Sequence, residues 1–224
     1  MKITNQTLAL LKNFSSINGS IIVRPGSKLR TVSPQNNIMA EAEVAETFDT
    51  SFAIYDLSQF LGAVSLFEDA DFDFQDSFVR VSTGKRNIRY FYADESMVKA
   101  PSEKKITLPS VDVEFDLTAG QLNEIQKAAS VLQVPEVAVI GVAGEQTRVA
   151  ALDTKNSTTN EFAVEVDHTS DTSNFKLIFK VENLKMINVD YKVQICAKGI
   201  SRFYNEKLKL EYFIAIESSS SFAK

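Results

Sequence analysis

The sequence is poor in the residues that usually carry catalytic chemistry or covalent cross-links. It has one cysteine, one histidine and no tryptophan among 224 residues. A single cysteine excludes an intrachain disulfide and a zinc site built from cysteines. His168 lies in a polar stretch predicted to be a loop, and Cys196 lies inside an alternating, strand-like segment. We therefore expect His168 to be a solvated loop residue rather than a catalytic base, and Cys196 to have a structural role.

Long apolar runs and flexible linkers are also missing. No hydrophobic stretch approaches the ~20 residues that a membrane-spanning helix needs, and polar residues follow Met1 where a secretion signal would have its apolar core. Five prolines and eight glycines leave no room for a long disordered linker. We expect a soluble, intracellular chain with no membrane partner, long enough for one large domain or two of ordinary size.

Known cofactor and metal motifs fail at defined positions. The stretch after Asp69 begins like a calcium loop, but Phe74 stands where that loop needs glycine and Arg80 where it needs glutamate. The Gly84-Lys85 pair lacks the serine or threonine that a phosphate-binding loop places next. No G-x-G-x-x-G or H-E-x-x-H motif occurs. These failures predict a protein that is not an enzyme and has no cofactor and no metal.

What the chain does have is an uneven distribution of charge. Its formal net charge is −5. Residues 1–30 contain five basic residues and no acidic one, whereas residues 31–79 contain ten acidic residues and neither Lys nor Arg. Such asymmetry indicates one surface suited to a polyanion and another that avoids one. A solvated acidic surface with scattered lysines is the simpler interpretation of charge alone.

The first half of the sequence alternates between helical and extended patterns. Leu8, Leu11 and Phe14 recur at helical spacing within residues 4–17, and Thr4 can cap that helix. Asp56 can cap a second, shorter helix over residues 57–66. Strands are predicted at residues 20–24, 28–33, 37–44, 51–55, 71–74, 77–83 and 87–93, with a weaker one at 97–100.

The second half repeats this order. Thr118 can cap a helix over residues 119–132, and a short helical stretch is predicted at 181–186. Laid over the first half, Leu122 falls on Leu8 and Lys180 falls on Asp56. The repeat predicts a duplicated α+β fold, with one domain at 1–100, a connector at 101–110 and a second domain at 111–224. Strands are predicted at residues 111–115, 136–142, 147–152, 160–166, 174–179, 190–197, 200–204 and 208–217, before a frayed tail at 218–221.

Short segments of both halves resemble one protein family. They are Leu-Ala-Leu-Leu-Lys-Asn-Phe at 8–14, Ala-Ile-Tyr-Asp-Leu at 53–57, Leu-Lys-Met at 184–186 and Ala-Lys-Gly at 197–199. With the duplicated layout, they make the chain similar to the DNA polymerase sliding clamps (processivity factors) of T-even-type bacteriophages, within the PCNA-like clamp family. The likeness covers nearly the whole chain, although residues 101–152 are matched by pattern alone.

The resemblance implies a fold, an assembly and a function. The fold is the duplicated DNA-clamp fold, with helices lining a ring and antiparallel sheets outside. A head-to-tail homotrimer would encircle double-stranded DNA without reading its sequence, tether the replicative DNA polymerase, and be placed on DNA by a clamp loader. Transcription proteins are possible further partners. Subunits would join by strand addition, at edges that we expect near residues 97–100 and 160–166. For a viral chain, the location would be the cytoplasm of the infected bacterium.

Two sets of candidate site residues follow from the resemblance. DNA-facing positions combine lysines, arginines and small polar residues on helices or in the first hairpin: Lys2, Lys12, Asn13, Ser16, Arg24, Lys28, Arg30, Lys127 and Lys185. A hydrophobic pocket beneath the connector would take a short C-terminal peptide of the polymerase or clamp loader. We expect it near Ile38, Met39, Ile106, Leu108, Phe213 and Ile214.

Two other functions compete with this hypothesis. A non-enzymatic structural or assembly protein of duplicated α+β design would oligomerise but ignore DNA and polymerase. A small hydrolase with dispersed carboxylates would show turnover that depends on metal or pH. We rank the clamp first, because neither alternative explains the family-like segments.

Overall fold

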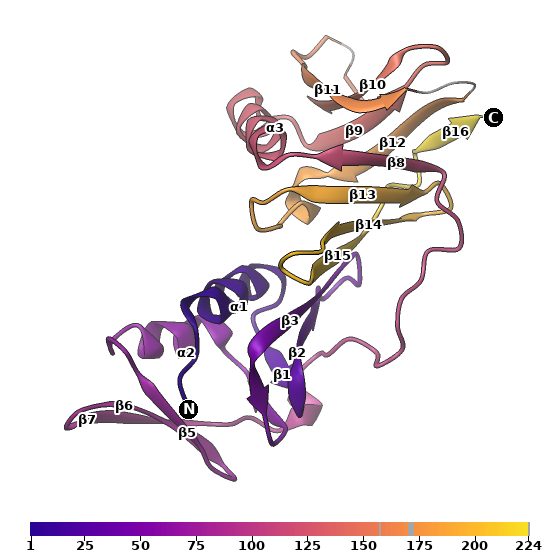
Figure 1. Ribbon diagram of the computed structural model, residues 1–224. Coiled ribbons are helices and arrows are strands. Elements are labelled where there is room, and N and C mark those ends of the chain that lie inside the picture. Colours follow the sequence, from indigo (N-terminus) through magenta and orange to yellow (C-terminus); the bar gives the residue numbers. More distant parts are fainter. Residues whose placement is uncertain (157, 170–172, 224) are drawn as a thin grey trace. The chain divides into compact units, whose positions relative to one another are not determined.

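The structure is a computed structural model that describes residues 1–156, 158–169 and 173–223. The chain divides into two compact units, Met1–Glu103 and Lys104–Lys224. In Figure 1 the first unit runs from indigo to magenta and the second from magenta to yellow. Residues 98–112, which include the predicted connector, contain neither helix nor strand.

The first unit contains two α-helices and three groups of antiparallel strands. Strand β1 pairs with β4, β2 pairs with β3, and β5, β6 and β7 form a meander. In chain order the elements are α1 Asn5–Ile17, β1 Ile21–Val23, β2 Gly26–Val32, β3 Ile38–Phe48, β4 Phe52–Ile54, α2 Leu57–Val64, β5 Asp71–Phe74, β6 Phe78–Thr83 and β7 Arg86–Phe91.

Helix α1 forms where the sequence pattern predicts it. The Thr4 hydroxyl accepts a hydrogen bond from the Thr7 N–H at 3.2 Å, so Thr4 is the N-cap. The buried stripe comprises Thr7, Leu10, Leu11, Phe14 and Ile17, whereas Leu8 is only half-buried. The helix therefore packs its apolar face on the unit and leaves a polar face exposed.

The second unit contains one α-helix between two antiparallel sheets. One sheet has the strand order β11-β10-β9-β12-β16; in the other, β8, β13, β14 and β15 pair in that order. The elements are β8 Val113–Leu117, α3 Ala119–Leu132, β9 Glu136–Gly141, β10 Gln146–Leu152, β11 Phe162–Thr169, β12 Asn174–Lys180, β13 Tyr191–Cys196, β14 Ile200–Asn205, β15 Leu210–Ala215 and β16 Ser221–Ala223.

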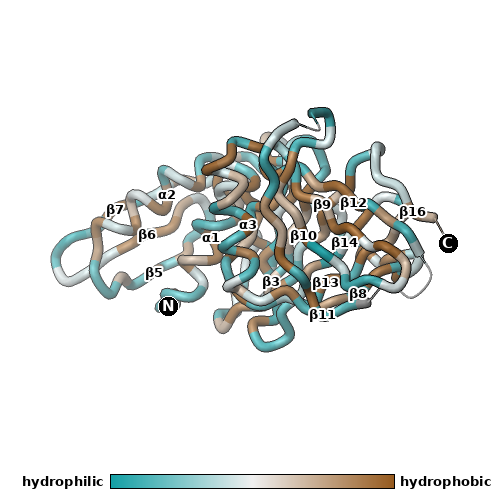
Figure 2. The backbone as a smooth tube through the Cα atoms, turned by 90° about the horizontal axis from the view of Figure 1, so that it is seen from above, coloured by the Kyte–Doolittle hydropathy of each residue, from teal (hydrophilic) through white to brown (hydrophobic). Residues whose placement is uncertain are grey.

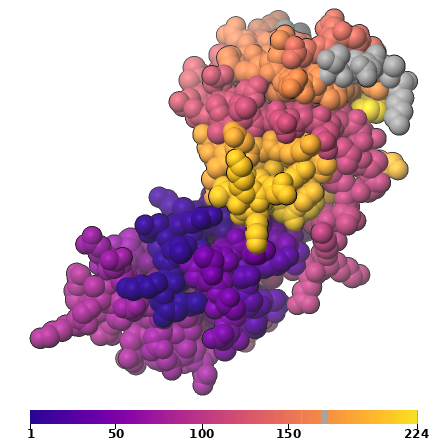
Figure 3. Space-filling model, viewed as in Figure 1, coloured from indigo at the N-terminus to yellow at the C-terminus, as the bar shows by residue number. Residues whose placement is uncertain are grey.

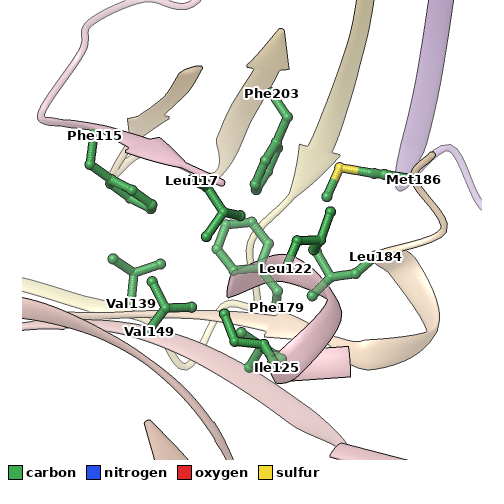
Figure 4. A pocket seen from close by; sticks show the side chains of 11 residues that line it. Phe115, Leu117, Leu122, Ile125, Val139, Val149, Phe179, Leu184, Met186 and Phe203 are labelled. Atoms are coloured by element: carbon green, nitrogen blue, oxygen red, sulfur yellow. The ribbon is translucent and has the colours of Figure 1, made fainter. Parts of the chain in front are cut away.

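The core of the second unit is apolar and closed. Leu122 and Ile125 of α3 meet side chains from both sheets, including Phe115 of β8, Val139 of β9 and Phe203 of β14 (Figure 4). The cavity left between them has a volume of about 20 Å³ and an entirely apolar lining. It is too small for a ligand and offers no partner to a water molecule, so it belongs to the packing of the unit.

Both units contain one order of elements, which is a long helix, four strands, a short helical segment and then three strands; the second unit adds β8 before this series and β16 after it. This confirms the predicted duplicated α+β organisation. The hydropathy pattern explains the layering: β9 is hydrophobic between its terminal residues, Glu136 and Gly141, whereas the turn between β6 and β7 is hydrophilic (Figure 2). Such strands are buried between layers and such turns lie at the surface.

Several sequence predictions were wrong. No strand forms at residues 97–100, where a 3₁₀ turn, η1 Glu95–Met97, is followed by extended backbone. Residues 181–186 form only a 3₁₀ turn, η2 Val181–Asn183, because Lys180 at the N-cap position makes no capping hydrogen bond. His168 lies in β11, where its Nδ1 is 2.7 Å from the Thr147 hydroxyl, and the C-terminal segment forms β16.

Candidate nucleic-acid interface

Helix α1 presents a polar face that contains no acidic residue. Lys12 and Ser16 are exposed and Asn13 is half-buried. The Ser16 hydroxyl donates to the Asn13 carbonyl at 2.6 Å, which holds the end of the helix in shape. Indigo residues of this N-terminal segment lie at the visible surface (Figure 3). The face offers one ammonium and several hydrogen-bonding groups, with no carboxylate to repel a phosphate.

Helix α3 presents a similar face in the second unit. Lys127 and Ser130 are exposed, and Glu124 is the one acidic residue of the helix. The N-terminus is fixed by a capping box, in which Thr118 and Gln121 each accept a hydrogen bond from the other's backbone N–H. The sequence therefore places a lysine at a comparable exposed position on each long helix.

Lys185 is not on a helix, which corrects the prediction of a fourth helix there. It is exposed and follows the η2 turn. The Gln126 side chain on α3 donates to the Leu184 carbonyl at 2.9 Å. This bond holds the Leu184–Met186 stretch beside α3, so Lys185 lies near the same helix as Lys127. The pattern of the sequence did not reveal this role of Gln126, since the bond spans 58 positions.

Arg24, Lys28 and Arg30 lie on a different side of the first unit. Residues 20–24 and 28–33 do not form a hairpin with each other, because β1 pairs with β4 and β2 forms its hairpin with β3. Side chains alternate along β2, where Leu29 and Thr31 are buried and Lys28 and Arg30 point to the opposite face. Helix α1 contacts β2 and β3. Arg24 lies just beyond β1 and lines the same shallow cleft as Lys28 and Arg30. We conclude that these cations occupy the outward face of the hairpin.

Carboxylates already engage the hairpin cations. Glu41 lies 2.8 Å from both Lys28 Nζ and Arg30 Nε, and Arg30 also donates to the Ser102 carbonyl at 2.8 Å. Arg24 lies 3.7 Å from Glu95 and 3.6 Å from Glu103. Each ion pair lowers the positive potential that these side chains could offer to a phosphate.

Lys2 is exposed but also held by acidic neighbours. Its ammonium group lies 3.4 Å from the Asp71 carboxylate and donates to the Asp69 carbonyl. Its backbone forms a bridge with Asp71 at the edge of β5. Of the nine predicted DNA-facing residues, the structure thus places Lys12, Asn13 and Ser16 together on α1, and Lys127 and Lys185 together at α3. The other four lie elsewhere in the first unit.

The predicted partner-pocket residues fall in three places. Ile38 and Met39 are buried neighbours at the start of β3. Ile106 and Leu108 are half-buried in the segment before β8. Phe213 and Ile214 follow one another on β15 and therefore point to opposite faces of its sheet. Ile214 is fully buried, and its carbonyl accepts a hydrogen bond from the Ser201 hydroxyl. Ile38 and Met39 in β3, and Phe213 and Ile214 in β15, are all buried strand residues.

Sequence patterns missed the charge carried by two edge strands. Strand β7 ends the β5-β6-β7 meander and β11 ends the five-stranded sheet. Arg86 and Arg89 are exposed on β7, and Glu165 and Asp167 are exposed on β11. The signal was visible in β7, because this strand carries two arginines and has no fully buried position. An edge strand of this kind can pair with another chain.

No helix in the described part of the chain is long and apolar enough to span a membrane.

Each unit of the chain matches a known protein family. Residues 3–98 match the family described as DNA polymerase processivity factor. Residues 114–218 match the family described as gp45 sliding clamp, C terminal. The two matches cover the two units separately and leave the intervening segment unmatched.

Similar proteins extend over the whole chain. The sliding clamp of Vibrio phage KVP40 is 36% identical over 97% of this chain and all of its own length. The sliding clamp of Enterobacteria phage T4 is 28% identical over 99% of both chains. A solved structure of A. fulgidus PCNA, bound to the C-terminal region of FEN-1, superposes with a TM-score of 0.71 at 16% identity, over 98% of both chains. The duplicated fold is therefore the DNA-clamp fold, and the chain belongs to the sliding-clamp family of DNA polymerase processivity factors.

Proposed function

We propose that three copies of this chain close into a ring around duplex DNA and that the ring tethers the replicative DNA polymerase. A clamp loader would open and place the ring, and the chain itself would catalyse nothing. The proposal rests on family membership and on one observation of this molecule, the distribution of its acidic residues. A ring holds DNA by topology, so its lining needs only weak, sequence-independent contacts.

Acidic residues are almost absent from the helices. Helices α1, α2 and α3 contain 13, 8 and 14 residues. Of the 29 Asp and Glu residues in the chain, Glu124 is the only one on these helices. Lys12 and Lys127 make the helices net positive in a chain of net charge −5. This segregation of charge supports helices that face a polyanion and strands that face outward.

The direct DNA contacts that we propose are Lys12, Asn13, Ser16, Lys127 and Lys185. All lie on or beside the two long helices. Arg24, Lys28, Arg30 and Lys2 are engaged by carboxylates, and we expect them to contribute a diffuse field rather than phosphate contacts. The partner-peptide pocket beneath the connector, near Ile38 and Ile106, stays a prediction, as do the domain limits 1–100, 101–110 and 111–224. A contact with transcription proteins stays one too.

Subunits would join through β7 of one copy and β11 of the next. Each is the edge strand of its sheet, and each carries charge of one sign, so antiparallel or parallel addition would bring Arg86 and Arg89 toward Glu165 and Asp167. Phe91, which is 62% exposed at the end of β7, would be covered by the contact. Different surfaces meet in such a contact, and its repetition forms a ring when the rotation between neighbouring copies closes after three copies.

The ring is tested by retention on DNA. Loaded protein should stay on a nicked circle and leave when a restriction enzyme linearises it. A Lys12→Glu/Lys127→Glu variant should bind duplex DNA more weakly and show a salt dependence reduced by up to about two phosphate contacts per subunit. Lys207→Glu, in an exposed turn of the second unit, is the matched control. Equal retention on circles and linear DNA would refute the ring.

The subunit contact is tested by exchanging its charges. Arg86→Glu/Arg89→Glu should shift the protein from trimer to monomer in sedimentation, because like charges then meet across the contact. Glu165→Lys/Asp167→Lys should do the same. The chain that carries all four changes restores opposite charges and should recover the trimer. Failure of the fourfold variant to reassemble, with folding intact by circular dichroism, would place the contact elsewhere.

A further inference from the structure

The first unit contains a cleft that the proposed DNA and subunit contacts do not use. It has a volume of about 380 Å³ and lies between the β3–β4 turn, the N-terminal residue and β5. That volume is within the range of pockets that hold small ligands or side chains of a bound peptide. Its lining residues come from three segments: Met1, then residues 47–50 with Phe52, and Phe72–Phe74.

One wall of the cleft is an aromatic cluster. Phe52 lies 5.0 Å from Phe74 and Phe48 lies 5.7 Å from Phe74, measured between ring centroids. Tyr92 stacks on Phe52 at 5.1 Å, and its buried hydroxyl has no hydrogen-bond partner among the described residues. Burial and the nearby Asp73 carboxylate raise the pKa of Tyr92 to about 12. Phe48 and Phe52 are buried within this cluster and Phe74 is half-buried, so Phe74 is the ring that can present its negative face to a cation.

The rim of the cleft carries carboxylates. Asp49 and Asp73 line it and are exposed. Asp73 accepts a hydrogen bond from Gln75 at 2.7 Å and lies across the strand pair from Arg80, whereas no donor in the described part of the chain bonds the Asp49 side chain. The cation of the cleft itself is the Met1 ammonium, which donates to the Phe72 carbonyl at 2.6 Å. The chain supplies no Lys or Arg between residues 31 and 79.

The backbone of β5 is open at this cleft. Phe72 directs both its N–H and its C=O to Met1, at 2.8 and 2.6 Å. In an antiparallel ladder these groups point to the same side at every second residue. The N–H and C=O of Phe74 therefore point to the same side of β5 as those of Phe72. No described residue forms ladder hydrogen bonds with Phe74 on that side. An extended peptide could add one strand position at this edge.

From the open backbone, the aromatic wall and the rim carboxylates, we propose that this cleft binds an extended segment of a partner protein that carries an arginine or lysine side chain. The peptide backbone would pair with Phe74. The cationic side chain would enter between the half-buried Phe74 ring and the Asp49 carboxylate. The inference uses residues of the first unit alone, so it stands apart from the ring proposal.

A labelled peptide tests the proposal on the full chain. The probe is fluorescein-Ser-Val-Arg-Val-Ser-amide, and its binding is measured by fluorescence anisotropy. We expect binding by the arginine peptide and a loss of about fivefold when citrulline, its neutral isostere, replaces arginine. Asp49→Lys should weaken binding by at least the same factor. Asp76→Lys alters an exposed acid of the same acidic stretch outside the cleft and should leave binding unchanged.

A photo-crosslinking peptide locates the site. With benzoylphenylalanine beside the arginine, the crosslink should fall on residues 47–52 or 72–74. The proposal is overturned by equal binding of the citrulline peptide, by equal effects of Asp49→Lys and Asp76→Lys, or by crosslinks elsewhere. Absence of binding up to about 1 mM protein would also overturn it. Protection of the cleft from crosslinking when the chain oligomerises would assign it to a second copy of this chain instead.

Discussion

The two units differ at the same position of their repeat, where a capping residue accompanies a helix in one unit and a non-capping residue accompanies a short turn in the other. Asp56 precedes α2 and accepts the Gln59 N–H at 2.8 Å, and eight residues follow in helical conformation. At the corresponding place in the second unit stands Lys180, which makes no capping hydrogen bond, and only a three-residue 3₁₀ turn forms. A carboxylate can accept from the free N–H groups of a helix N-terminus, whereas an ammonium cannot.

The long helices differ in where their caps come from. In α3 the capping box is local, since Thr118 and Gln121 are three residues apart. In α1 the position three residues after Thr4 is Thr7, which has no side-chain acceptor of the right length. Glu46 of β3 replaces it: its carboxylate accepts from the Thr4 N–H at 2.5 Å and from the Thr7 hydroxyl at 2.6 Å. The acceptor that completes the N-terminal cap thus comes from a distant strand in the first unit and from the helix itself in the second unit.

Removing the tertiary cap should have the largest effect. Glu46 is buried, with 6% of its surface exposed, and Glu46→Ala leaves two donors without a charged acceptor. We expect a loss of about 2–3 kcal/mol in the free energy of unfolding. The matched change Gln121→Ala at the local cap should cost about 0.5–1 kcal/mol. Denaturant unfolding of each variant measures both. Equal losses would contradict the distinction between the two caps.

The same contact should make the first unit sensitive to acid. Although burial alone would raise the pKa of Glu46, the hydrogen bonds from Thr4 and Thr7 hold it below the usual 4.5. A group with a lowered pKa in the folded state stabilises above its unfolded pKa, and this stability is lost as the pH falls through the folded value. The protection factors of the α1 amides, which correct for the intrinsic pH dependence of exchange, should fall below about pH 4.5. In Glu46→Gln the α1 amides should lose that pH dependence, while the α3 amides stay unchanged.

Exchanging the caps of the short helical segments should have smaller effects than the loss of Glu46. Asp56→Ala should cost about 1 kcal/mol, because α2 loses its N-cap. Lys180→Asp should stabilise the second unit by up to about 1 kcal/mol and increase the helix signal in circular dichroism. Lys176→Asp, on the neighbouring strand β12, controls for the change in charge. A Lys180→Asp protein with no added helix would show that packing of Leu184 and Met186, rather than the missing cap, limits the turn.

Much of the fold followed from local patterns. The α3 boundaries at Ala119 and Leu132 were predicted from Thr118 and the helical spacing of Leu122 and Ile125, since caps and periodicity act within a few residues. The prediction of a helix at 181–186 was wrong. The apolar residues there have helical spacing, but Lys180 stands at the N-cap position and makes no capping hydrogen bond. The strand at 97–100 failed because a strand needs a pairing partner, and partner choice is not local.

The sequence predicted which types of residue form the candidate site, but it predicted the positions of only some of them. The sequence by itself determined that the long helices carry lysines and almost no acids, and that two halves repeat one design. Only the tertiary structure decided that Lys28 and Arg30 lie opposite the buried face of β2, that Glu46 caps α1, and that β7 and β11 are edges. The reason is physical. Helical faces repeat every few residues along one segment, whereas strand order and sheet edges depend on contacts between segments far apart in the chain.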